Sequence, residues 1–124
     1  MEKVRVAKKF SFDAAHFLPG YLGKCANLHG HRWEVELAIE GPVDSATGMV
    51  VDFKWLKSAL EDILEKFDHN LLNDILFNPT AENLAIYVRN SVNISRIQGS
   101  NEAIRIAWVR VWESPDSYVE VLDE

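Results

Sequence analysis

The sequence has one cysteine among its 124 residues, Cys25, so it cannot form an internal disulfide. It has no run of about 18 apolar residues, the length that indicates a membrane-spanning helix, and its first residues lack the apolar core of a signal peptide. Internal repeats and low-complexity segments are also absent. These absences argue against a disulfide scaffold, a membrane protein and a repeat array, and they predict a protein of the reducing cytoplasm.

Basic residues are also scarce, because 13 Lys and Arg face 19 Asp and Glu, for a net charge of -6. General nucleic-acid binding depends on phosphate neutralisation by Lys and Arg, and we expect none here. The content of 48% hydrophobic and 26% charged residues is ordinary for a globular protein. The length suits one domain over residues 1–124, with a core of useful size.

Apolar and polar residues alternate along residues 4–16 and again along residues 29–40, which is the period of a half-buried strand. The apolar side of the first strand ends at His16. His29 and His31 lie two positions apart and therefore share the apolar side of the second strand. Two strands can thus bring three histidines to one face at the rim of the core.

Three neutral imidazoles with a fourth position left for water or substrate are typical of a catalytic zinc site. Scattered surface histidines are the alternative, and a single His-x-His pair would favour it. The lone Cys25, four residues before His29 and next to Lys24, favours a site, because a thiolate can serve as ligand, base or nucleophile. A lone cysteine can equally be a small buried apolar residue.

Helical spacing of apolar residues predicts one helix from Asp52, as N-cap, to Phe67 and a second over residues 81–92 with Thr80 as N-cap. Residues 98–101 read as a turn. Strands over about 103–112 and 118–122 complete a β-β-α-α-β-β order, which indicates an α+β fold with an antiparallel four-stranded sheet and a helix pair on one face. The strand over 103–112 is apolar on both sides, which favours assembly into an oligomer.

Five segments, taken together and in order, resemble the 6-pyruvoyltetrahydropterin synthase family over nearly the whole chain. They are Phe12-Asp13-Ala14-Ala15-His16, Cys25-x-x-x-His29-Gly30-His31, Phe67-Asp68-His69-Asn70-Leu71, Asn78-Pro79-Thr80-Ala81-Glu82-Asn83 and Trp112-Glu113-Ser114. The chain is most similar to the bacterial and archaeal branch of 6-carboxy-5,6,7,8-tetrahydropterin synthases of queuosine biosynthesis. The resemblance implies the tunnelling fold, in which subunits join their sheets into a barrel, commonly in a hexamer made of two trimers.

The resemblance also implies roles for individual residues. His16, His29 and His31 would bind Zn2+, and Cys25 would be the general base. His69 would transfer protons, with Asp68 tuning the imidazole. The alternative is that a helix ends there, since the dipole of a helix C-terminus favours a histidine cation. Glu113 would accept two hydrogen bonds from a pterin, although an exposed strand end explains it as well. Thr80 would line the same pocket, although its capping role suffices to explain it.

The implied reaction is zinc-dependent conversion of 7,8-dihydroneopterin triphosphate to 6-carboxy-5,6,7,8-tetrahydropterin with release of acetaldehyde and triphosphate. The short spacing from Cys25 to His29 favours this branch over the 6-pyruvoyltetrahydropterin synthases of tetrahydrobiopterin biosynthesis, which typically carry a longer insert. The cysteine itself argues against variants with glutamate there, which cleave dihydroneopterin phosphates. A non-catalytic, zinc-stabilised assembly protein is a third hypothesis, but it has no need of Cys25, His69 and Glu113 together.

Overall fold

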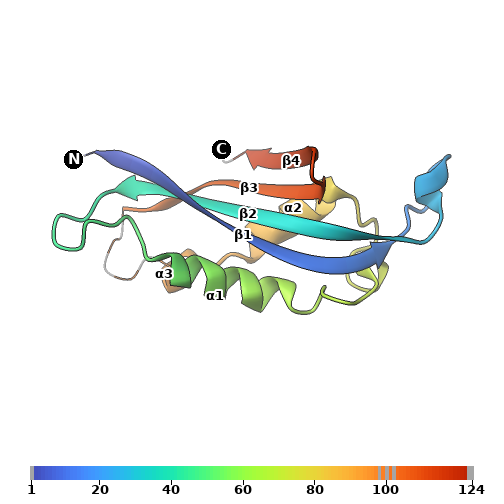
Figure 1. The fold of residues 1–124 in the computed structure, drawn as a ribbon, viewed down its shortest axis with the longest axis horizontal. Helices are drawn as coiled ribbons and strands as arrows, with labels where there is room; N and C mark the ends of the chain where they lie inside the picture. The colour runs from blue at the N-terminus through green and yellow to red at the C-terminus, as the bar shows by residue number, and fades with distance from the viewer. Residues whose placement is uncertain (1, 98, 100, 102, 123–124) are drawn as a thin grey trace.

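The computed structural model describes residues 2–97, 99, 101 and 103–122, which form an α+β fold (Figure 1). The strands are β1 (Lys3–His16), β2 (His29–Pro42), β3 (Arg105–Ser114) and β4 (Ser117–Leu122); the helices are α1 (Phe53–Leu64), α2 (Ala81–Ser91) and α3 (Ile94–Ile97). Single 3-10 turns cover Lys24–Ala26 and Leu72–Asp74. The predicted fold class and the order of its main elements are confirmed.

The sheet has the strand order β1-β2-β3-β4, and every neighbouring pair is antiparallel. The ladder between β1 and β2 is continuous from the pair Lys3 and Pro42 to the pair His16 and His29. This unbroken register follows from the matched alternation of the two strands, since a slip by one residue would turn every apolar side chain to the other face. It also fixes where the histidines meet.

The helices cover one face of the sheet, with α1 against β1 and α2 against β3 and β4 (Figure 1). The core lies between these two layers, and each buried Leu- or Phe-sized side chain contributes about 1.5–3 kcal/mol. Its largest fully buried apolar residues come from both layers: Phe12, Trp33, Leu37, Ile39, Leu56, Leu60, Leu64, Phe67, Leu72, Leu84 and Ile97. The core therefore continues along β1 and β2 to the end where the histidines lie.

Both predicted helix caps are present. The Asp52 side chain accepts a hydrogen bond from Lys54 N at 2.9 Å, and Thr80 Oγ1 accepts one from Asn83 N at 3.1 Å. The first helix, however, ends at Leu64 rather than at Phe67, because turns take over as the chain bends toward the edge of β1. Phe67 still enters the core, which is why its spacing looked helical.

Some predicted boundaries were wrong by a few residues. The third strand covers Arg105–Ser114, two residues later than expected, and β2 continues through Gly41 and Pro42, beyond the predicted range of 29–40. The short helix α3 was not predicted. Of the predicted turn at 98–101, residues 98 and 100 lie outside the described part of the chain, and Gly99 has the positive φ of 55° that favours glycine.

The face of the sheet away from the helices carries aromatic residues covered by cations. The guanidinium of Arg110 lies 4.1 Å from the centroid of the Trp108 ring, and the Lys9 ammonium lies 4.6 Å from that of Trp112. The long stems of Lys and Arg shield apolar surface while their charges stay in water. The two-sided apolar pattern of β3 thus has partial cover within one chain, and the barrel assembly stays a prediction.

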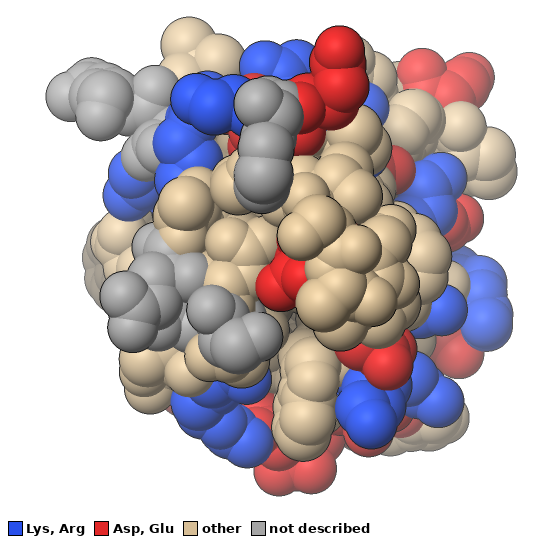
Figure 2. Space-filling model, turned by 90° about the vertical axis from the view of Figure 1, so that its left-hand side faces the viewer, with Lys and Arg blue, Asp and Glu red and all other residues tan. Residues whose placement is uncertain are grey.

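The end of the molecule farthest from the histidines has acidic and basic groups side by side, with uncharged atoms between them (Figure 2). No basic face is visible in this view. None of the described helices has both the length and the apolar character needed to span a membrane.

Candidate metal and pterin site

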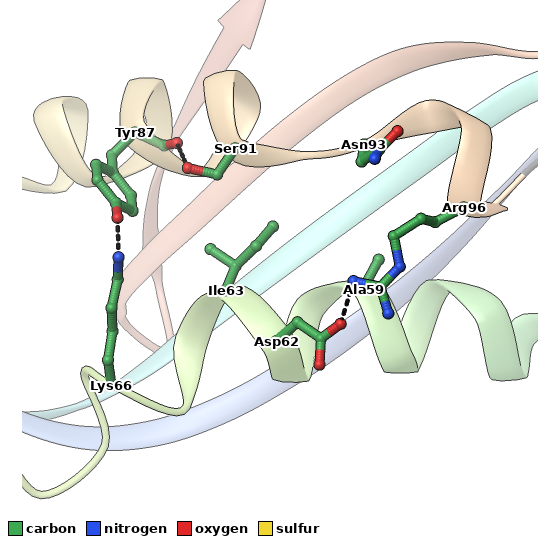
Figure 3. Close-up of a pocket in the computed structure, with 8 residues that line it drawn as sticks. All are labelled: Ala59, Asp62, Ile63, Lys66, Tyr87, Ser91, Asn93 and Arg96. Atoms are coloured by element: carbon green, nitrogen blue, oxygen red, sulfur yellow. Dashed lines mark hydrogen bonds and ion pairs between the residues drawn. The ribbon is translucent and has the colours of Figure 1, made fainter.

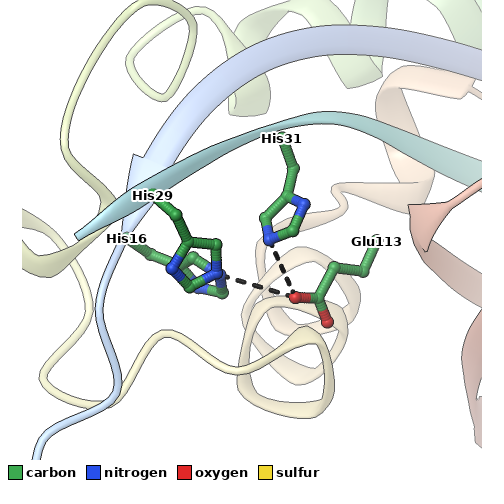
Figure 4. Close-up of side chains that lie close together, drawn as sticks. All are labelled: His16, His29, His31 and Glu113. Atoms are coloured by element: carbon green, nitrogen blue, oxygen red, sulfur yellow. Dashed lines mark hydrogen bonds and ion pairs between the residues drawn. The ribbon is translucent and has the colours of Figure 1, made fainter. Parts of the chain in front are cut away.

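Three histidines from β1 and β2 converge with a glutamate at the end of β3 (Figure 4). His16 and His29 are direct partners in the ladder, and His31 lies two residues further along β2 on the same face. Glu113 approaches them from β3. One candidate ligand atom from each of the four residues lies within 4.8 Å of all the others. The structure therefore brings the three predicted ligands together.

Backbone carbonyl groups fix the orientation of two of these rings. His16 Nδ1 lies 2.7 Å from Pro79 O, and His29 Nδ1 lies 2.6 Å from Asn27 O. A carbonyl oxygen only accepts hydrogen bonds, so in each neutral ring we assign the proton to Nδ1. The two Nε2 atoms then turn their lone pairs toward each other at a separation of 3.0 Å. Such an arrangement repels itself unless a cation lies beside both nitrogens.

The third ring adds another nitrogen that lacks a hydrogen bond. His31 Nε2 lies 3.1 Å from Glu113 Oε1, but without hydrogen-bond geometry, so this buried atom has no hydrogen-bond partner among the described residues. Burial lowers the pKa of His31, only partly opposed by the Glu113 carboxylate, and the neighbouring His16 and His29 lower it further. The ring is thus biased toward the neutral form that metals require.

The apolar floor of the cluster is Trp33, whose side chain is fully buried. Its ring centroid lies 4.9 Å from that of His16 and 5.5 Å from that of His31, and its Nε1 donates to Ala14 O at 3.2 Å. An apolar floor lowers the local dielectric constant and strengthens any charge interaction above it. Three imidazole nitrogens with one carboxylate in such surroundings fit a zinc-type cation better than calcium or magnesium, which prefer oxygen ligands.

A second cluster, formed by Asp13, Asp68 and His69, lies at the outer edge of β1. His69 Nδ1 is 3.0 Å from Asp68 Oδ1, which also accepts a hydrogen bond from Asp13 N at 3.0 Å. That backbone hydrogen bond is the main reason why the pKa of Asp68 lies below its ordinary value. The two side chains meet although the residues are adjacent, and His69 has a positive φ of 59°, which is uncommon for a residue other than glycine.

The remaining predicted residues belong to neither cluster. Cys25 is half-buried in the 3-10 turn within the β1–β2 loop, and its carbonyl accepts a hydrogen bond from Leu18 N at 2.9 Å. Thr80 caps α2 through its hydroxyl oxygen, next to the Pro79 carbonyl that contacts His16. Among the described residues, the Cys25 thiol belongs to neither of the two groups of candidate metal ligands.

One hollow of about 590 Å³ connects the two clusters, because both His31 and His69 line it. Its volume is within the range of small-molecule sites. The other lining residues are Asp13, Ala14, Ala15, Gly30, Arg32, Asn70 and Leu71. A ligand there would lie beside an imidazole from each cluster and beside the Arg32 guanidinium.

A second hollow, of about 260 Å³, lies between α1 and the α2–α3 segment, and no histidine lines it (Figure 3). Its polar groups already have partners: Lys66 contacts the Tyr87 hydroxyl, Arg96 pairs with Asp62, and Ser91 Oγ donates to Tyr87 O at 2.7 Å. No ligand is needed to satisfy them. The chemistry therefore points to the hollow between His31 and His69.

Sequence reasoning missed the groups that support the predicted residues. Asp13 supplies a backbone N–H to Asp68, and Pro79 and Asn27 supply carbonyl oxygens to the histidines. All three lie within or beside the segments that showed the family resemblance. Their contribution comes from the backbone, however, so the identity of the side chain carries no signal for it.

Comparisons with known proteins agree with this geometry. The family model for 6-pyruvoyl tetrahydropterin synthase matches residues 5–124. A 6-carboxy-5,6,7,8-tetrahydropterin synthase of Haemophilus influenzae is 32% identical over 94% of this chain and 96% of its own length, and a dihydroneopterin monophosphate aldolase of Pyrococcus furiosus is 31% identical over 96% and 97%. The structure of 6-pyruvoyl tetrahydropterin synthase from Caenorhabditis elegans superimposes with a TM-score of 0.83 at 28% identity, covering 100% of this chain and 98% of that one. The chain therefore belongs to the 6-pyruvoyl tetrahydropterin synthase family.

Proposed function

We propose that this protein is a zinc-dependent lyase that converts 7,8-dihydroneopterin triphosphate to 6-carboxy-5,6,7,8-tetrahydropterin, with release of acetaldehyde and triphosphate, in queuosine-type deazapurine biosynthesis. The observation that carries the proposal is the convergence of His16, His29 and His31 beside a hollow that also reaches His69. Relatives named 6-carboxy-5,6,7,8-tetrahydropterin synthase support the choice of product.

The three histidines and the groups around them would hold the cofactor. His16 and His29 present their Nε2 atoms with the rings anchored through Nδ1, and His31 supplies the third nitrogen. A bound zinc ion would polarise an oxygen of the substrate side chain and ease removal of a neighbouring proton. Glu113, whose side chain is one-third exposed, would accept hydrogen bonds from the 2-amino and N3–H groups of the pterin.

Proton transfer is assigned to Cys25, Asp68 and His69. A thiolate base at Cys25 would remove a proton from the substrate side chain, and His69 would return one, since an imidazole can accept and donate protons near neutral pH. Asp68, ionised at neutral pH, holds the Nδ1 side of His69 and so leaves Nε2 for the reaction. Thr80 would line the pterin pocket near the start of α2.

Two findings favour neighbouring activities of the family enough to test them. The family description and the Caenorhabditis elegans structure name 6-pyruvoyl tetrahydropterin synthases, and the Pyrococcus furiosus relative is named an aldolase acting on dihydroneopterin monophosphate. The Cys25 spacing supports the 6-carboxy product over the first of these. Pterin binding by the zinc-loaded protein separates all three enzymes from a non-catalytic assembly protein.

The deciding experiment is incubation of the purified, zinc-loaded protein with 7,8-dihydroneopterin triphosphate, with the pterin product identified by mass spectrometry. We expect a 6-carboxy product together with acetaldehyde. A 6-pyruvoyl product would assign the protein to the tetrahydrobiopterin branch, and a 6-hydroxymethyl product would make it an aldolase. Absence of turnover and of binding to sepiapterin would favour the assembly protein.

A further inference from the structure

The chain that follows α1 runs along the outer edge of β1 and hydrogen-bonds to it. His69 N donates to Asp13 O at 2.6 Å, and Ala15 N donates to Asn70 O at 3.2 Å. β1 is an edge strand of the sheet, so these bonds satisfy backbone groups that would otherwise face solvent. They also connect the segment that carries His69 to the strand that carries His16.

Asn73 continues this line of hydrogen bonds with its side chain. Its Oδ1 accepts from Phe17 N at 3.0 Å, and its Nδ2 donates to Phe17 O at 2.9 Å. The amide therefore imitates the peptide of a neighbouring strand at the first residue after β1. Its orientation is determined, because a flipped amide would place donor against donor and acceptor against acceptor.

Phe17 lies at a junction of the predicted site. The residue before it is His16, the most deeply buried of the histidines, and the residue after it, Leu18, donates its N–H to the carbonyl of Cys25 at 2.9 Å. One peptide therefore connects a predicted metal ligand to the loop that carries the predicted base. The Asn73 amide is the partner of both polar groups of Phe17.

We propose that Asn73 is a positioning residue that holds His16 in place for metal binding and fixes the base of the loop that carries Cys25. This inference rests on the proposed function, since it presumes that the histidines bind zinc. β1 ends at His16, so its ladder with β2 does not hold Phe17. Without the two hydrogen bonds from Asn73, the peptide after His16 can rotate, and the position of His16 Nε2 relative to His29 Nε2 depends on the β1–β2 ladder and on Pro79 O alone. Groups that orient metal ligands typically contribute 10- to 100-fold in metal affinity.

The test compares Asn73→Ala with Asn101→Ala. Asn101 is a matched control, because its amide nitrogen also makes two partly buried bonds to backbone, to Pro42 O at 3.1 Å and to Val50 O at 2.9 Å, near the other end of β2. Zinc affinity is measured by competition with a chelating dye, metal-free stability by thermal unfolding, and site geometry from the visible spectrum of the cobalt-substituted protein. Asn73→Asp, which keeps the acceptor for Phe17 N but loses the donor, serves if Asn73→Ala does not fold.

We expect both alanine variants to melt at lower temperature than the wild-type protein. Only Asn73→Ala should bind zinc about tenfold more weakly and alter the cobalt spectrum, with Asn73→Asp changed in the same direction. Wild-type affinity and spectrum in Asn73→Ala, or in Asn73→Asp if only that variant folds, would overturn the inference, as would an equal loss in Asn101→Ala. A wild-type protein that binds zinc without turning over the pterin would overturn only the proposed reaction. One that binds no zinc would overturn the metal site and this role with it.

Discussion

The two clusters of candidate ligands differ in burial and in how their polar atoms are satisfied. In the histidine cluster His16 is 1% exposed and two lone pairs face each other, whereas the side chain of His69 in the second cluster is 78% exposed. The Asp68 carboxylate already receives two hydrogen-bond donors, from Asp13 N and His69 Nδ1. The first cluster therefore has the nitrogen donors and the unsatisfied polar atoms of a metal site, whereas the carboxylate of the second cluster already has its hydrogen-bond partners. The distances between ligand atoms alone do not distinguish the two clusters.

The strongest test of this difference removes one imidazole from each cluster. His31→Ala should lower zinc affinity at least about a hundredfold, since zinc binding gives roughly 10–16 kcal/mol and one of the three protein ligands accounts for about a third of it. Turnover should disappear with the metal. His69→Ala should keep its zinc and lose turnover, as measured by dye competition and by product formation. Zinc loss in His69→Ala would show that the two clusters are not distinct.

Removal of the thiol should separate chemistry from metal binding. Cys25→Ala should keep its zinc and its oligomeric state but lower kcat by about 10²–10⁴-fold, the usual effect of removing a general base. Steady-state kinetics with metal analysis and gel filtration provide the measurement. Normal turnover in Cys25→Ala would mean that the base is another group.

A smaller effect is expected for the carboxylate that orients His69. Asp68→Asn should lower kcat roughly tenfold by removing a charged hydrogen-bond partner, and should move the pH profile of kcat, because the amide no longer favours the protonated imidazole. Asp116→Asn is the control: Asp116 is also exposed and held by hydrogen bonds that lower its pKa, but it lies in the β3–β4 turn. An unchanged pH profile in Asp68→Asn would contradict the tuning role.

The smallest effect concerns the metal-free protein. Because burial lowers the pKa of His31, the unfolded chain binds a proton near pH 6 that the folded chain does not. The free energy of unfolding should therefore be highest above about pH 6.5, the ordinary pKa of histidine. It should decrease as the pH falls through 6.5 toward the lowered pKa of His31. Thermal unfolding of metal-free wild-type protein should show this decrease, and His31→Asn should reduce it. An identical pH dependence in the two proteins would assign it to other groups.

The sequence was informative wherever side-chain period and pairing carry the information. Alternation along residues 4–16 and 29–40 predicted two strands with three histidines on one face, and the structure pairs them as that pattern requires. Capping chemistry located the starts of α1 and α2 at Asp52 and Thr80. The boundaries that failed, at Phe67 and Pro42, are places where packing against the sheet or continued pairing outweighs local preference.

The site was less predictable where its geometry depends on the backbone. The facing Nε2 atoms follow from carbonyl groups of Pro79 and Asn27, and the contact between Asp68 and His69 follows from one left-handed residue. The two hydrogen bonds between the Asn73 amide and the backbone of Phe17 depend on how the chain after α1 lies against β1. No residue type or spacing in the sequence indicates these contacts.

The sequence by itself determined the α+β class, the family and the identity of the candidate ligands, because strand period, caps and motif residues are local properties of the chain. Tertiary structure alone decided which polar atoms are buried without a partner, which face a shared hollow, and which backbone groups orient them. Those properties arise from contacts between segments such as β1, β2 and residues 68–79 that are distant along the chain. Burial and hydrogen bonding across such distances give the two clusters their different chemistry.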